Sequence, residues 1–501
     1  MSNLERKTPT LRNLGKVMVL YALGSFLQRI GTLILVPLYT SVLLVSEYGA
    51  LETIMVTLTI LSILINLGLS NSLIRFYPEC NREEDIYEMI RTSWVLVIVF
   101  SFVLFFLIRP FFGQIGLVLL KDKNQGELIA ATFIWAIGGA LNQQFFSYYR
   151  ARQDARGFII VSILFFLAST LLNILLVRFM NMNLAGVIYG NLIAVWSINL
   201  IATIKFFGCG RSISVRWAKK LIGFGFPLVF GMLGWLILNS ADRYFLAYYR
   251  DLPEVGIYGL GYKVGLIAQM TVVLPFQLAW PSYIFSVSLS SGEDAKAKFS
   301  RIFTYLLAGF CFVGLGIYLF SNEIVFLLGS GKFAQSAEVI PYVLVAYLFS
   351  VIYYWSGSFL YLTNKSTLAS AILIAMAGLN LYLNWTWIPI WGWKGAAWAT
   401  VVAVGGAGIF TLLAGEWAYP IKLQYVRMIK LFLTVCIIAL VHSLVDAPSL
   451  VLNLLMLAVL LLCMPLLLIL VRFFESFEIR FMLNLLELAR RKLIFVKVGN
   501  K

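Results

Sequence analysis

The chain has 501 residues, of which 61% are hydrophobic and 12% are charged, whereas soluble domains carry about 25% charged residues. A water-soluble fold could not cover so much apolar surface, so a lipid bilayer is the expected solvent. The net charge of +16 does not call for nucleic acid as a partner, because Lys and Arg collect at the cytoplasmic ends of membrane helices. One histidine and five scattered cysteines leave almost nothing from which to build a metal site or a Ser-His-Asp triad, and no cofactor is expected.

Long apolar runs set the expected topology. The runs are continuous rather than alternating, which predicts helices and not a barrel, and each crossing needs about 20 apolar residues. We expect about fourteen spans, at residues 15–39, 48–75, 92–112, 128–149, 157–178, 184–206, 221–249, 256–285, 301–321, 338–362, 367–387, 395–415, 429–446 and 449–471. The first run is too long for a signal peptide and reads as a retained helix.

Basic residues indicate the orientation. The N-terminus, the even-to-odd connections and the C-terminal tail together hold 29 Lys and Arg, and the opposite connections hold seven. Three more, Arg29, Arg243 and Lys263, fall inside spans. The bias predicts that both termini are cytoplasmic.

Three short patterns recur at offsets of 207 to 210 residues, which indicates an internal repeat. The paired positions are Tyr48-Gly49 with Tyr258-Gly259, Asn173 with Asn380, and Gly186 with Gly395. Six spans separate the copies, so the copies have the same orientation in the membrane. The expected fold is therefore an all-α membrane protein with two parallel six-helix lobes and two further helices.

This repeat divides the chain into four predicted parts. They are an N-lobe at 1–207, a C-lobe at 208–420 that starts with a basic linker, two added helices at 421–472 and a tail at 473–501. The tail carries an apolar stripe at helical spacing followed by basic residues. It reads as an interfacial helix on the anionic inner leaflet, or as a helix that packs on a neighbouring subunit.

Charges within the hydrocarbon are the best pointers to function, since each costs roughly 2.5–3.5 kcal/mol at mid-span. Arg29 lies thirteen residues after Lys16, about 20 Å into the first span, beside Gln28. Arg29 is expected either to line a cavity and grip an anionic substrate or to pair with Glu52 and hold the lobe together. Glu52 is otherwise a candidate proton or cation site.

The corresponding depth of the second lobe also carries charge. Asn239 and Arg243 share a face of the seventh span, and Asp242, a second candidate ion site, points about 100° away. Arg243 either lines the cavity or snorkels to the outer interface. Lys263, in the eighth span, either reaches the cavity or stretches to the outer water.

Arg75 ends the second span and fits a cytoplasmic entrance, although an ordinary positive-inside anchor is the stronger reading. The first, second, seventh and eighth spans thus hold the strong intramembrane charges. Together they predict a shared, water-filled, net-positive cavity, which suits an acidic or phosphate-bearing cargo better than a cationic drug.

Catalytic motifs are missing. The sequence contains no GxxxxGK[ST] phosphate loop, no HExxH and no connection long enough for a catalytic domain. We therefore expect a transporter and not an enzyme.

The first eighty residues resemble a known family. The matching segments are Leu14-Gly15 through Gln28-Arg29, Pro37-Leu38-Tyr39, Glu47-Tyr48-Gly49, and Ser70 to Pro78. They are similar to the polysaccharide transporters of the multidrug/oligosaccharidyl-lipid/polysaccharide exporter superfamily, the O-antigen flippase type, and the chain's length and fourteen expected spans fit that family.

This resemblance implies a function. It implies a flippase of the bacterial inner membrane that moves an undecaprenyl-diphosphate-linked oligosaccharide to the outer leaflet by alternating access. Arg29 fits the family's basic cavity residues, and Lys263 fits them less closely. H⁺ or Na⁺ is the implied coupling ion, membrane lipids surround the chain, and polysaccharide polymerase and chain-length regulator proteins are candidate partners.

Other functions stay open. A lipid II flippase is the nearest alternative, and a cation-coupled drug antiporter of the same superfamily is a more distant one. A membrane-embedded polymerase usually needs a large outer loop, whereas the longest outer connections here have about fifteen to seventeen residues. A non-transporting scaffold would not explain the intramembrane charges.

The first prediction concerns Arg29. Arg29→Ala should stop delivery of the lipid-linked oligosaccharide, and Arg29→Lys should keep part of it, because the cation grips an anionic cargo. Leaflet-resolved transport of a labelled lipid-linked oligosaccharide in proteoliposomes measures this. Transport at the wild-type rate by the Ala variant would remove Arg29 from the cavity.

Overall fold

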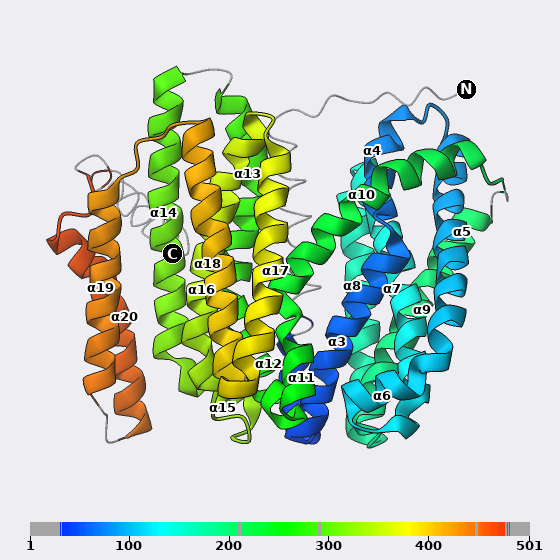
Figure 1. The fold of residues 1–501 in the computed structure, drawn as a ribbon, viewed down its shortest axis with the longest axis horizontal. Helices are drawn as coiled ribbons and strands as arrows, with labels where there is room; N and C mark the ends of the chain where they lie inside the picture. Colours follow the sequence, from blue (N-terminus) through cyan, green and yellow to red (C-terminus); the bar gives the residue numbers. More distant parts are fainter. Residues whose placement is uncertain are drawn as a thin grey trace, which may run out of the picture. The chain divides into compact units, whose positions relative to one another are not determined.

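The computed structural model describes residues 31, 33–208, 210, 212–288, 292–445, 449–475, 478 and 480. Every regular element in these ranges is a helix (Figure 1). Twelve stretches of the described chain are helices long and apolar enough to cross a membrane. The helix α7 (Gly126–Arg152) has the length but is not among them, and most of the predicted first span lies outside the described residues. The all-helical membrane fold is confirmed, and a total of about fourteen spans stays a prediction.

The contacts between residues divide the chain into two compact units. The first contains residues 1–283 and 321–419, and the second contains residues 284–320 and 420–501. The predicted lobes at 1–207 and 208–420 are not separated by this grouping and stay a prediction.

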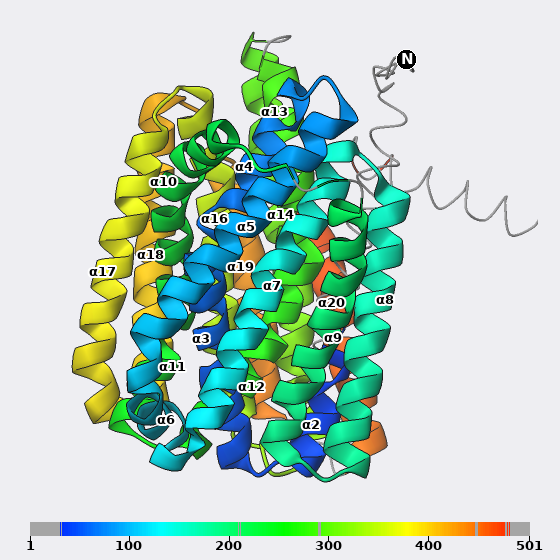
Figure 2. The ribbon, with the colours of Figure 1, turned by 90° about the vertical axis from the view of Figure 1, so that its right-hand side faces the viewer.

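The first unit holds most of the helices, which run up and down past one another (Figure 1). Its earlier helices are α2 (Val36–Val42), α3 (Val45–Asn66), α4 (Leu69–Phe76), α5 (Glu83–Ile108), α6 (Phe112–Leu120), α7, α8 (Ala155–Asn173) and α9 (Asn183–Phe207). Its later helices are α10 (Val215–Ser240), α11 (Asp242–Tyr249), α12 (Leu252–Ala268), the start of α13 (Leu274–Ser288), α15 (Ser321–Gly329), α16 (Ser336–Leu362), α17 (Ser366–Trp391) and α18 (Trp393–Ala418). Figure 2 shows α7, α8 and α9 beside one another, and contacts join α9 to both others.

The second predicted span, 48–75, consists of two helices instead of one. Leu67 and Gly68 adopt left-handed backbone angles, with φ of 49° and 70°, and this ends α3 and starts α4. A side chain at Gly68 would lie only 2.2 Å from the carbonyl oxygen of Gly225. Glycine therefore permits both the turn and the close approach of α10.

The helices α3 and α12 cross at a contact made by glycines (Figure 1). A Cβ atom added at Gly49 would lie 1.8 Å from the carbonyl oxygen of Leu252, and one added at Gly256 would lie 2.5 Å from that of Val45. Glycines let two membrane helices approach to backbone contact, which strengthens dispersion contacts where no hydrophobic effect drives association. This crossing positions the side chains that follow it on both helices.

The long helix α10 packs on the N-terminal helices with its first half and on α17 with its second half. Near its start, the hydroxyl of Ser72 donates to the carbonyl oxygen of Leu221 at 2.8 Å. Farther along, Leu238 joins a buried cluster with Leu373 of α17. Pro227 lies between the two halves, and a proline inside a helix removes a backbone hydrogen bond and permits a bend. This helix therefore links the two predicted lobes.

The second unit contains α14 (Gly292–Leu319), α19 (Tyr425–Leu444) and α20 (Leu450–Leu470). Arg427, in the first turn of α19, donates to Glu478 at 2.9 Å and to Glu475 at 3.4 Å. The Arg427 guanidinium also lies 4.7 Å from the ring centre of Phe473. These contacts attach the start of the predicted tail to α19, and most of residues 473–501 lies outside the described residues.

The glycine crossing yields the second prediction. Gly256→Leu should destabilise the protein by about 1–3 kcal/mol, because the added side chain would overlap the backbone of α3. The thermal unfolding midpoint of the purified protein in detergent measures this. The matched control is Gly378→Leu, since a Cβ atom at Gly378 meets nothing within 4 Å. Equal midpoints for the two variants would contradict the tight crossing.

Candidate functional site

A buried ion pair joins α3 to α12 just past their crossing. Glu52 and Lys263 approach to 2.5 Å between Oε1 and Nζ, and their side chains are 6% and 22% exposed. The Lys263 ammonium also donates to the hydroxyl of Tyr48 at 3.1 Å. A Cβ atom at Gly259 would lie 2.5 Å from Cγ of Glu52, so glycine makes room for the acid. The pair therefore depends on the same close approach as the crossing.

A second ion pair lies at the start of α11. Asp242 and Arg243 approach to 2.8 Å, and their side chains are 1% and 6% exposed. The hydroxyl of Tyr258 donates to the other oxygen of Asp242 at 2.6 Å. The Arg243 guanidinium donates to the backbone carbonyl of Asn239 at 2.6 Å and lies 4.1 Å from the ring centre of Tyr262. Both charges of this pair are thus held by several neighbours.

Tyr48 and Tyr258, the tyrosines of the sequence repeat, each contact one member of an ion pair. Tyr48 contacts the base of one pair, and Tyr258 contacts the acid of the other. One helical turn later, α3 carries Glu52 and α12 carries Tyr262, which stacks on Arg243. The repeat is therefore a sequence signal for Tyr48 and Tyr258 as site residues, although the sequence alone predicts only that they are equivalent positions of the repeat.

The structure brings together Glu52, Lys263, Asn239, Asp242 and Arg243 on four helices, α3, α10, α11 and α12, each of which contacts others of the set. Asp242 and Arg243 pair although they lie about 100° apart on the helix, because adjacent side chains can still bend toward each other. Burial of the Arg243 side chain does not fit the snorkelling alternative. Lys263 turns to Glu52 and not to outer water.

Three predicted residues are not among those brought together. Gln28 and Arg29 are outside the described residues. The Arg75 side chain is 58% exposed and lies 3.8 Å from Glu79 near the start of α10, away from the ion pairs. The Glu79 carboxylate also accepts a hydrogen bond from Lys220 at 2.7 Å, and this bond lowers the pKa of Glu79. Arg75 thus belongs to an exposed charged end of the helices.

The described cluster has no net charge, whereas the sequence predicts a net-positive cavity. The two acids and two bases of the ion pairs cancel. Arg29 lies outside the described residues, so the net-positive cavity stays a prediction. No group of three His, Cys, Asp or Glu side chains that could hold a metal occurs in the part of the chain that the structure describes.

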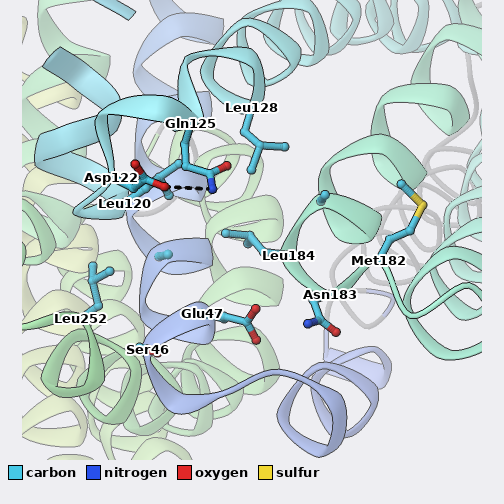
Figure 3. Close-up of a pocket in the computed structure, with 12 residues that line it drawn as sticks. Ser46, Glu47, Leu120, Asp122, Gln125, Leu128, Met182, Asn183, Leu184 and Leu252 are labelled. Carbon is cyan, nitrogen blue, oxygen red and sulfur yellow. Dashed lines mark hydrogen bonds between the residues drawn. The ribbon is translucent and has the colours of Figure 1, made fainter. Parts of the chain in front are cut away.

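A separate hollow of about 360 Å³ lies near the start of α3 (Figure 3). The two carboxylates that line it accept hydrogen bonds from backbone N–H groups nearby in the chain. Glu47 accepts from the backbone N–H of Leu44 at 2.9 Å, and Asp122 accepts from that of Asn124 at 2.9 Å. Figure 3 also shows Gln125 turned to Asp122. Helix capping accounts for these acids, and we do not assign the hollow a ligand.

Solved transporters share this fold. The lipid II flippase MurJ, in an inward closed conformation, is 15% identical, with a TM-score of 0.64 over 89% of this chain and 98% of that one. A multidrug resistance MATE family transporter in an outward-facing conformation and a MOP superfamily transporter from Pyrococcus furiosus are each 14% identical, with TM-scores of 0.58 over 80% of this chain and 95% of theirs. At these identities the likeness concerns the fold alone. None of the curated proteins matches.

The family assignment comes from the sequence match. Residues 14–288 match the family described as "Polysaccharide biosynthesis protein". The matched region contains both ion pairs and the helices that carry them. Because it covers more than half of the chain, this protein belongs to the polysaccharide biosynthesis protein family.

Proposed function

We propose that this protein is a flippase that moves an undecaprenyl-diphosphate-linked oligosaccharide from the inner to the outer leaflet of a bacterial cytoplasmic membrane. The family match and the transporter fold support a membrane transporter or flippase. The main structural support for the proposal is the presence of two buried ion pairs where α3, α11 and α12 meet.

The Glu52–Lys263 ion pair suits a gate between the predicted lobes, because it joins α3 to α12, whereas Asp242 and Arg243 are neighbours on α11. Desolvation of buried charges offsets most of their attraction, so a buried ion pair adds little net stability. When α3 and α12 separate, all four charges can regain water. The closed and open arrangements can then differ by little free energy, as alternating access requires.

The distribution of basic residues indicates on which side of the membrane the proposed gate lies. Arg75 and Lys220 lie at the basic ends of the helices, and Glu52 lies near the opposite end of α3. If the basic ends are cytoplasmic, the ion pairs close the outer side. A cargo that enters from the inner leaflet would then stay between the predicted lobes until this gate opens.

The same arrangement offers a route for ion coupling. While the gate is closed, Glu52 is paired with Lys263 and Asp242 is paired with Arg243. Separation of α3 and α12 would take Glu52 away from its cation. Glu52 could then accept H⁺ or bind Na⁺ from the outer side. Asp242 keeps its cation on its own helix, so Glu52 is the better candidate of the two.

A lipid II flippase is the second candidate function, because a solved protein of that description has a TM-score of 0.64 with this chain. Fold similarity does not choose between the two cargoes. Proteoliposomes loaded in parallel with lipid II and with an O-antigen-type lipid-linked oligosaccharide would separate them. Faster transport of lipid II would overturn the proposed cargo.

The third prediction tests the gate. Glu52→Gln should lower stability by about 3–5 kcal/mol and reduce transport, because Lys263 would stay buried without its acid. The double variant Glu52→Gln/Lys263→Gln should recover most of the stability. Thermal unfolding and leaflet-resolved transport measure both effects.

The matched control for this prediction is Glu79→Gln, which removes an acid from an exposed cluster. Exposed ion pairs are screened by water and contribute little to stability, so this variant should differ little from the wild type. If Glu52→Gln behaved like Glu79→Gln, the gate would not depend on the ion pair.

A further inference from the structure

A cavity of about 620 Å³ lies between α10 and the helices α3, α4, α7 and α8. Its volume is within the range of about 300–1,000 Å³ typical of small-molecule sites. Thr59 lies at one end of the lining and Arg150, near the basic end of α7, at the other. Thr59 follows Glu52 by seven residues, about 10 Å along α3. The cavity is therefore on the basic side of the ion pairs.

The chemistry of the lining is unusual for a membrane helix interface. It contains four amide side chains, from Asn66, Asn71, Gln143 and Asn239, together with aromatic rings and hydroxyl groups. Among the described residues that line it, Arg150 is the only charged one and none is acidic. A site without acids does not suit a cationic drug, and it accepts a neutral or anionic ligand.

Two of the amides are available for a ligand. Asn66 donates to Ser70 and to the carbonyl oxygen of Ala140, so its side chain is part of the wall. In contrast, Asn71 and Gln143 make no side-chain hydrogen bond to another described residue, and both have solvent-accessible surface. Each amide offers two donors and one acceptor oxygen.

An aromatic ring faces these amides from the other side of the cavity. Trp235 of α10 lines the cavity and is stacked on Tyr353 at 5.7 Å between ring centres, which fixes its orientation. A pyranose ring presents hydroxyl groups at its edge and C–H groups on its face. Amides that both donate and accept match the edge, and a fixed aromatic ring matches the face.

We infer that this cavity binds an uncharged sugar ring of the cargo, with hydroxyl or acetamido groups, and that Asn71, Gln143 and Trp235 recognise it. Arg150 stands at the basic end, where the diphosphate of the same cargo would lie. This inference rests on the proposed function, since it names the part of the cargo that the cavity selects.

Asn239 connects the cavity to the ion pairs. Its side chain lines the cavity, and its backbone carbonyl accepts from Arg243 at 2.6 Å. Its side-chain oxygen also accepts from the hydroxyl of Tyr262 at 3.5 Å. A sugar that contacts Asn239 would therefore act on the residues that hold Arg243, which links occupancy of the cavity to the gate.

The fourth prediction is a binding experiment in nanodiscs with two probes. One is undecaprenyl diphosphate carrying an N-acetylated disaccharide, and the other is undecaprenyl diphosphate without sugar. The wild type should prefer the first by at least tenfold. Asn71→Ala and Gln143→Ala should each reduce this preference several-fold, and together about tenfold, because each removes hydrogen bonds to the sugar.

Two further variants make the experiment decisive. Gln143→Glu keeps the shape of the side chain and adds a negative charge, so it should weaken binding of both probes. Asn124→Ala removes an exposed amide from the opposite end of the helices and should change neither. Thermal unfolding of each variant checks that it is folded.

The outcomes separate the two proposals. Equal affinity of the wild type for both probes, or an unchanged preference in the double variant, would overturn the sugar site while leaving transport of lipid-linked cargo in place. No binding of either probe, together with no transport of lipid-linked oligosaccharide, would overturn the proposed function itself.

Discussion

The close contact between α3 and α12 is the constraint on which the rest of the site depends. Gly49 and Gly256 let the two backbones touch, and this brings Glu52 and Lys263 to within 2.5 Å. Without that approach, two charges would lie in a low-dielectric region with no partner, at a cost of several kcal/mol each. A contact made by residues without side chains thus makes buried charge tolerable.

Much of the fold could be predicted from composition and periodicity, because the bilayer imposes long apolar helices. The break at Leu67 and Gly68 could not, since left-handed backbone angles at a leucine leave no mark in an apolar run. The role of α10 was equally hidden. Its sequence shows a span with a proline, but only the structure shows which half packs on which lobe.

The candidate site was predictable in part. Intramembrane charge identified Glu52, Asp242, Arg243 and Lys263, because hydrocarbon excludes unpaired ions. The pairing of Glu52 with Lys263 was not predictable, because Lys263 follows Glu52 by 211 residues and no pattern in the sequence links the two. Of the amides that line the cavity, Asn239 is predicted from the sequence, whereas Asn66, Asn71 and Gln143 are not, because neutral polar side chains are common in membrane helices and carry no charge signal.

The order of these features along the helices has a mechanical consequence. The cavity begins about two turns from Glu52, and α10 forms one of its walls. The first half of α10 is tied to α4 by Ser72, and its last turn contacts Arg243 through Asn239. In the proposed gating, a rotation of the predicted lobes that separates α3 from α12 would therefore bend α10 or slide one of its halves. Pro227 lies between those halves, where a missing backbone hydrogen bond makes bending least costly. The helix that lines the cavity is thus also the helix that would transmit the opening of the gate.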